Sequence, residues 1–150
     1  MWEVNIYINV MGTIRPATGY WGYVLGTMVN DKEETKHDFG EEVNATLNVL
    51  HLMALLRALE RLKKPCHVTI YADSNYIAGI INNNLLDVWA SNKWINSKGK
   101  PVKNAEIWKK IWKYSMEHEL VVEVVENHPY KSWQLGEMKR LERAENVDFP

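Results

Sequence analysis

The feature of this 150-residue chain that most restricts its fold is the apolar segment at residues 45–62. Val49, Leu52 and Leu56 recur there at helical spacing, and further leucines and alanines cover most of the circumference. Asn44, just before the segment, predicts the N-cap of a helix. Because a helix that is apolar nearly all round is buried, the sequence predicts a long helix packed within the molecule.

The segments on both sides of this helix alternate between apolar and polar side chains, which is the period of a half-buried strand. Residues 2–10, 20–29 and 33–40 precede the helix, and the Asn30-Asp31 pair predicts a hairpin between the last two. Residues 67–73 follow the helix. This order of strand, long helix and strand predicts a right-handed parallel crossover beside three antiparallel strands.

The remainder of the chain continues as alternating helices and strands, without an internal repeat or a linker. Ser74 and Asn104 predict helix N-caps. Further helices are expected from just after Ser74 to about residue 81, at residues 86–94, at residues 105–116 and from Ser132. A fifth strand is expected at residues 119–126. We therefore expect one α/β domain over residues 1–150, with a five-stranded mixed sheet flanked by helices.

The composition sets broad limits on where the chain works. Cys66 is the single cysteine and cannot form an internal disulfide, and residues 1–10 alternate rather than forming a leader-like apolar run. No apolar stretch approaches the roughly 20 residues that span a bilayer. These features predict an intracellular, cytoplasmic protein without a membrane partner.

The charge of the chain is unevenly distributed, although the formal net charge is only -1. Residues 93–113 contain seven lysines and a single acid, Glu106. Such a cluster is typical of a surface that binds a polyanion, and equally of the solvated face of a helix. The cluster alone leaves both interpretations open. Its members are Lys93, Lys98, Lys100, Lys103, Lys109, Lys110 and Lys113.

Several short motifs resemble those of type 1 ribonuclease H, in the order and spacing of that family, from Val4 to about Ala144. The strongest is Gly99-Lys100-Pro101-Val102-Lys103-Asn104 followed by Ile107-Trp108, which resembles the end of the family's basic handle. That handle helps the family grip an RNA–DNA hybrid. The other matches are residues 19–22, 58–63 and 71–76, with Trp89 and Trp94 at two tryptophan positions of the handle.

The resemblance implies an active site in which four carboxylates hold two Mg²⁺ ions for phosphodiester hydrolysis. The family's first-strand aspartate becomes Asn9 in this chain, a neutral amide. The long-helix glutamate becomes His51, which lies 22 residues before Asp73, as in the family. Asp73 itself is retained. Two of the first three acidic positions are therefore changed.

The remaining two catalytic positions that the resemblance implies lie near the end of the chain. The terminal-helix aspartate falls on Met138 without gaps, and on Glu137 after a shift of one residue. His128, in Asn127-His128-Pro129, matches the family's mobile-loop histidine. With Glu137 included, the set still offers about half of the negative charge that two Mg²⁺ ions need. We therefore expect this site to bind two Mg²⁺ ions poorly.

A rebuilt site with one divalent metal is the alternative that the resemblance leaves open. Asp73, His51 and Glu137 are its expected ligands, for Mg²⁺ or Mn²⁺ and less readily for Zn²⁺. Each residue also has a purely structural interpretation. The His51 ring could be satisfied by Asn9 or Asp73, Asn9 could bond the next loop, and Asp73 could lie on the N-cap side of a helix.

The positions that contact nucleic acid in the family are better preserved. Thr46 and Asn48 match backbone-contacting residues around Leu47, which replaces an asparagine, and Arg15 stands near another such position. Hydroxyl, amide and guanidinium groups suit contacts to phosphate and sugar, although Thr46 and Asn48 also suit helix capping. The handle contributes Lys93, Lys98, Lys100 and Lys103.

Two functions of different classes follow from these residues. In the first, the chain binds RNA–DNA hybrid and hydrolyses the RNA strand with an altered metal site. In the second, it is a catalytically inactive module that binds hybrid or another duplex nucleic acid. A third alternative is a protein-contact role for Trp2 and Trp133. The sequence leaves the oligomeric state open.

Overall fold

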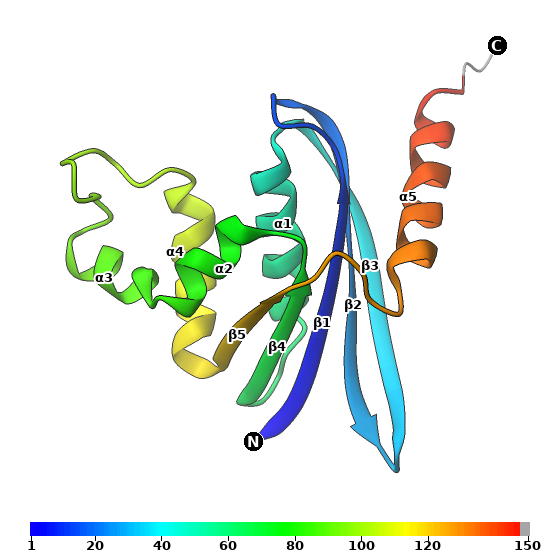
Figure 1. Cartoon of the computed structure of the whole chain (residues 1–150), viewed down its shortest axis with the longest axis horizontal. Helices are drawn as coiled ribbons and strands as arrows, with labels where there is room; N and C mark the ends of the chain where they lie inside the picture. Colours follow the sequence, from blue (N-terminus) through cyan, green and yellow to red (C-terminus); the bar gives the residue numbers. More distant parts are fainter. Residues whose placement is uncertain (148–150) are drawn as a thin grey trace.

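A computed structural model of the chain describes residues 1–147, so residues 148–150 of the predicted domain lie outside the described part. Its centre is a five-stranded sheet in the order β3-β2-β1-β4-β5 (Figure 1). The strands β1, β2 and β3 pair antiparallel, whereas β4 is parallel to β1 and β5 is parallel to β4. The predicted mixed sheet is confirmed. The strands are β1 (Trp2–Met11), β2 (Ala17–Val29), β3 (Lys32–Ala45), β4 (Cys66–Ala72) and β5 (Glu119–Val124).

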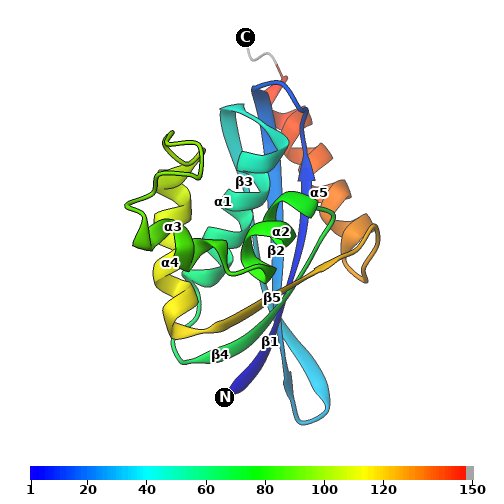
Figure 2. The same ribbon diagram turned by 60° about the vertical axis from the view of Figure 1, so that its left-hand side comes forward.

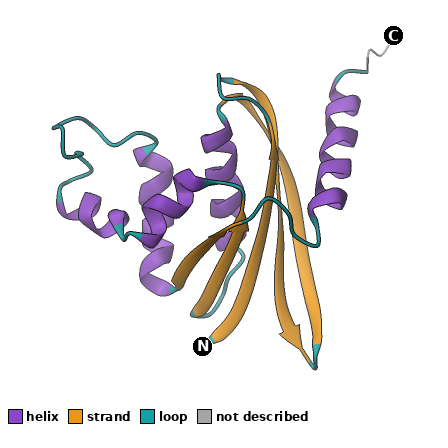
Figure 3. Ribbon diagram, in the orientation of Figure 1, coloured by secondary structure: helices purple, strands orange, loops and turns teal. Residues whose placement is uncertain are grey.

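Helices cover both faces of the sheet (Figures 1 and 3). On one face, α1 packs on β1 and β2, and α4 packs behind α1. On the other face, α5 lies alone across β1 and β2 (Figure 1). The helices are α1 (Leu47–Leu59), α2 (Asn75–Asn82), α3 (Leu85–Ser91), α4 (Ala105–Glu117) and α5 (Lys131–Glu145). None of those within residues 1–147 is long and apolar enough to cross a membrane.

The core forms where α1 meets the sheet. Eight of the thirteen residues of α1 are buried, as its apolar circumference predicts. Ile6, Ile8 and Ile70 face this helix from the sheet and are almost fully excluded from solvent. Burial on several sides fixes α1 against β1 and β2. The side chains that α1 presents at the ends of these strands are therefore held in place.

The predicted cap Asn44 is wrong, whereas Asn104 stands at the predicted N-cap position of α4 but makes no side-chain cap bond. Asn44 has φ 51° and lies within β3, which continues to pair with β2 beyond Gly40. An N-cap needs extended backbone, and Thr46 has it, with its Oγ accepting the N–H of Val49 at 3.2 Å. Asn104 has φ 60° and makes no side-chain cap; its Nδ2 donates to the Tyr76 hydroxyl instead.

Other predicted connections are confirmed. Asn30 and Asp31 both have positive φ, the conformation of a two-residue hairpin whose twist matches the strands it joins. Ser74 caps α2 by accepting the N–H of Ile77 at 3.2 Å. The connection after β4 is therefore short and fixed, and Asp73 stands directly between the strand and the cap.

Candidate active site

The structure brings Asn9, His51 and Asp73 to the lining of one pocket of about 260 Å³. Asn9 stands near the end of β1, and Asp73 follows the end of the parallel strand β4. His51 lies in the second turn of α1. Since parallel neighbours place their carboxyl ends at the same edge of a sheet, the two strand ends meet there. Three of the five expected catalytic residues thus share one site.

His51 is held in a defined tautomer. Its Nδ1 lies 2.9 Å from the Leu47 carbonyl oxygen, one helical turn earlier, and must donate to it because a carbonyl can only accept. The ring's partner is therefore Leu47, not Asn9 or Asp73. Burial lowers the pKa of His51, and the Leu47 carbonyl and the Asp73 carboxylate oppose this lowering in part. At neutral pH the ring is uncharged and its Nε2 carries no proton.

The buried neutral histidine predicts how stability depends on pH. Because the pKa of His51 is lower in the folded chain, the unfolded chain takes up the proton first as the pH falls. The contribution of His51 to the free energy of unfolding should be constant above about pH 7 and decrease below the ordinary histidine pKa of about 6.5. Urea denaturation of His51→Gln between about pH 7 and pH 5 should show a smaller decrease than the wild type.

The decrease should not vanish in that variant, because burial also lowers the pKa of His118 and of His128. In both rings Nδ1 is an acceptor, from the N–H of Cys66 and of Tyr130 respectively. An identical decrease in His51→Gln and the wild type would contradict the burial of a neutral ring at position 51.

Asn9 and Asp73 differ in how they are satisfied. The Oδ1 of Asn9 is buried and has no hydrogen-bond partner among the described residues. Asp73 is exposed at the pocket, and the capping role beside it belongs to the Ser74 hydroxyl. Asn9 therefore makes no loop bond through this oxygen, whereas Asp73 does lie on the N-cap side of α2, directly before the Ser74 cap.

The terminal helix reaches the pocket through residues other than those expected. Glu137 does not line it; its carboxylate pairs with Arg140 at 3.1 Å. Met138 is fully buried in the layer between α5 and the sheet. Instead, Lys131 and Leu135 line the pocket, and Glu126 lines it from the connection between β5 and α5.

Sequence reasoning missed Lys131 because it compared the terminal helix position by position, and it missed Glu126 because the connection after β5 has no regular period. The helical spacing holds the missed signal: Lys131, Leu135 and Met138 lie at i, i+4 and i+7, on one face. Since Met138 is buried, the residue seven positions before it must also face the sheet. His128 does not line the pocket. Its half-buried ring lies 5.4 Å, centre to centre, from the ring of Tyr7.

The charges of the pocket do not fit a pair of Mg²⁺ ions. Asp73 and Glu126 are its two carboxylates, Lys131 contributes a positive charge, and Asn9 and His51 are neutral. Within residues 1–147, no three His, Cys, Asp or Glu side chains are grouped so as to hold a metal ion. Two hard dications need several oxygen ligands and a comparable negative charge, which this lining lacks.

The residues expected to touch nucleic acid fall in two places. Arg15 is exposed in the turn between β1 and β2, and Asn48 lies in the first turn of α1. The N–H of Leu47 donates to the Thr13 carbonyl at 3.0 Å, which fastens this turn to the start of α1. The hydroxyl of Thr46 is engaged in the helix cap.

The second place is the handle, residues 92–104, a loop between α3 and α4 (Figure 2). The Oδ1 of Asn96 accepts the N–H groups of Lys98 and Lys100, and Ile95 pairs with Pro101. Trp94 packs against Trp89 and Trp112, so this tryptophan serves handle packing. The four expected lysines, Lys93, Lys98, Lys100 and Lys103, are all exposed.

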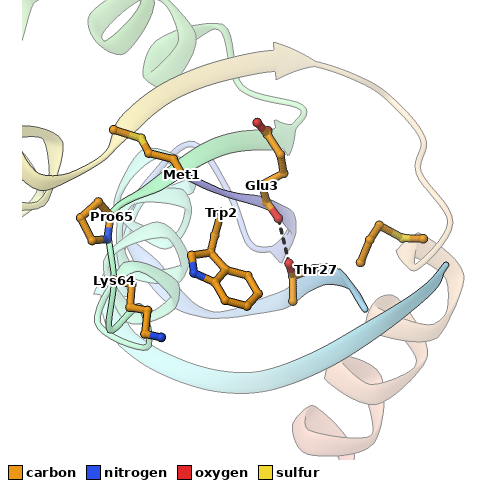
Figure 4. A pocket seen from close by; sticks show the side chains of 7 residues that line it. Met1, Trp2, Glu3, Thr27, Lys64 and Pro65 are labelled. Atoms are coloured by element: carbon orange, nitrogen blue, oxygen red, sulfur yellow. Dashed lines mark hydrogen bonds between the residues drawn. The ribbon is translucent and has the colours of Figure 1, made fainter. Parts of the chain in front are cut away.

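A larger hollow, of about 750 Å³, lies at the other end of β1 (Figure 4). Trp2 forms one wall, with the Lys64 ammonium 5.7 Å from the centre of its ring. Trp2 and Asn9 are about 23 Å apart along the strand, at about 3.3 Å per residue. Trp133 contacts other neighbours, His37 and Phe39. The hollow is thus separate from the pocket that Asn9 lines.

Comparison with known proteins decides the family. The family model for RNase H matches residues 3–135, which include β2 to β5, the handle and β1 except for its first residue. The chain belongs to the RNase H family. Ribonuclease H of Rickettsia bellii is 36% identical over 138 residues, covering 89% of this chain and 83% of that protein. Ribonuclease H of Caldicellulosiruptor saccharolyticus is 35% identical over 128 residues, covering 85% and 86%.

Solved structures agree with this RNase H assignment at the level of the fold. LC9-RNase H1, a type 1 RNase H with the type 2 active-site motif, superposes with a TM-score of 0.73 at 17% identity, over 99% of this chain and 78% of that one. The foamy viral protease-reverse transcriptase in complex with RNA/DNA hybrid gives 0.70 at 20% identity, over 92% and 19%. This chain therefore has an RNase H fold.

Proposed function

We propose that this RNase H chain binds RNA–DNA hybrid without cutting it by the family's two-Mg²⁺ chemistry. The single observation that supports this proposal is the lining of the pocket, where Asn9 and His51 are neutral and Lys131 is positively charged. Family membership supports the hybrid as the ligand, and a structural neighbour is described in complex with RNA/DNA hybrid.

The binding surface of the proposal combines the handle with the start of α1. The exposed lysines of the handle neutralise backbone phosphates, which contributes affinity without reading sequence. Arg15 and Asn48 add a guanidinium and an amide near the pocket, on a turn and a helix that are fastened together. Such contacts position a duplex by its shape and backbone.

Cleavage makes different demands from binding. Hydrolysis of a phosphodiester needs an activated nucleophile and stabilisation of the leaving oxygen, which two metal ions supply elsewhere. The neutral amide of Asn9 offers one weak oxygen ligand, and the His51 ring offers no negative charge. Asp73 alone keeps the family's acidic character at its position.

The test of this proposal measures binding and cleavage of one labelled hybrid side by side. We expect the protein to form a complex with the hybrid and the RNA strand to stay intact with Mg²⁺, Mn²⁺ or Zn²⁺. Cleavage should not differ between the wild type and Asp73→Asn. The alternative, a hydrolase with one metal held by Asp73, His51 and Glu137, predicts cleavage that Asp73→Asn removes. Absence of hybrid binding would also overturn the proposal, because it would remove the binding function itself.

A further inference from the structure

Lys131 is the one positively charged residue in the lining of the pocket, all of which lies in the described part of the chain. It is the first residue of α5 and follows the connection from β5 that carries His128. Its ammonium Nζ donates to the Glu126 carbonyl oxygen at 2.5 Å, and its backbone N–H donates to the His128 carbonyl at 3.2 Å. The side chain is therefore fastened at the rim of the pocket, not free in solvent.

The position of this ammonium is further fixed by the docking of α5. Gln134, one turn later, is fully buried, and its Nε2 donates to the Tyr7 carbonyl of β1 at 2.9 Å. This bond ties the first turns of α5 to the strand that carries Asn9. The charge of Lys131 also acts on the nearby ring of His128. Burial is the main cause that lowers the pKa of His128, and the Lys131 ammonium adds to this lowering, whereas the Ile8 carbonyl opposes it.

The pocket needs a cation before a phosphate can approach it. Asp73 and Glu126 are both exposed carboxylates at its rim, and each repels the backbone of a nucleic acid. A positive charge between the carboxylates and the phosphate reduces that repulsion. Divalent metal ions do this where enough acids hold them, but the neutral Asn9 and His51 do not complete such a set.

We propose that Lys131 supplies this charge and receives a backbone phosphate of the bound hybrid, so that binding does not require a divalent metal ion. This inference rests on the proposed function. It assigns to the pocket a contact with the sugar–phosphate backbone, in addition to the contacts of the handle. The N-terminal end of α5, which carries partial positive charge, lies on the same side as the ammonium.

The experiment compares hybrid affinity for the wild type, Lys131→Gln and Lys139→Gln, by fluorescence anisotropy in Mg²⁺ and in EDTA at equal ionic strength. Lys139 is an exposed lysine of the same helix that does not line the pocket, and it serves as the matched control. We expect equal wild-type affinity in Mg²⁺ and EDTA. Lys131→Gln should lose roughly three- to tenfold in both, with a salt slope smaller by about 1.

Lys131→Arg should restore most of the affinity, which distinguishes loss of charge from damage to α5. Equal affinity of Lys131→Gln and the wild type would overturn the assignment of Lys131 while leaving hybrid binding intact. A wild-type affinity that falls in EDTA would also overturn it, because a metal ion would then supply the charge. Failure of the wild type to bind hybrid at all would overturn the proposed function and this inference together.

Discussion

Replacing the handle lysines Lys93, Lys98, Lys100 and Lys103 by glutamine is expected to weaken hybrid binding by roughly ten- to hundredfold at about 0.1 M salt. All four side chains are exposed on a loop that hydrogen bonds of Asn96 hold in shape. Each ammonium that neutralises a phosphate releases a counterion, so the loss should be larger at low salt. The slope of log affinity against log salt should decrease by about 3 to 4.

The measurement is an anisotropy titration at several salt concentrations. Its matched control replaces four exposed lysines far from the handle, Lys32, Lys36, Lys63 and Lys64. These lie in or beside the β2–β3 hairpin and the α1–β4 connection, away from the handle (Figure 1). A control that weakens binding as much as the handle variant would indicate attraction by general charge, and it would contradict a handle contact.

Trp108→Ala is expected to lower the free energy of unfolding by about 3–5 kcal/mol, the range for removing a large buried aromatic side chain. Trp108 is completely buried in α4, and its Nε1 donates to the Tyr76 hydroxyl at 2.9 Å. Its ring also packs edge-on against Trp89 of α3, with centroids 6.3 Å apart. Removing it opens a cavity and leaves the Tyr76 hydroxyl without this donor.

Urea denaturation followed by circular dichroism measures this loss. Trp133→Ala is the control, because Trp133 is 42% exposed and packs against His37 and Phe39 of the edge strand β3. We expect the control to lose about 1 kcal/mol or less. Equal losses at the two positions would mean that the packing between α2, α3 and α4 does not support the fold as described.

Most of the fold could be predicted because its segments obey simple periodicities. The alternation of residues 2–10 became β1, and the apolar circumference of residues 45–62 became the buried helix α1. The end of β3 could not be predicted in this way. Beyond Gly40 the polar sequence resembles a loop, yet pairing with β2 carries the strand to Ala45 and displaces the cap to Thr46. Partners distant in sequence decided that boundary.

The pocket was predictable where regular elements carry its residues. Strand ends placed Asn9 and Asp73, and the helix between the strands placed His51. The contribution of Glu126 and Lys131 was not predicted, because the connection after β5 has no period. The length of that connection sets which face of α5 meets the sheet, and that face brings Lys131 instead of Glu137 to the pocket.

The most direct test of the central claim is a single reaction in which wild-type protein, labelled RNA–DNA hybrid and Mg²⁺ are followed for both binding and cleavage. The proposed function predicts a salt-sensitive complex whose RNA strand stays intact, unchanged when EDTA replaces Mg²⁺. RNA cleavage that needs Mg²⁺ and disappears in Asp73→Asn would contradict it.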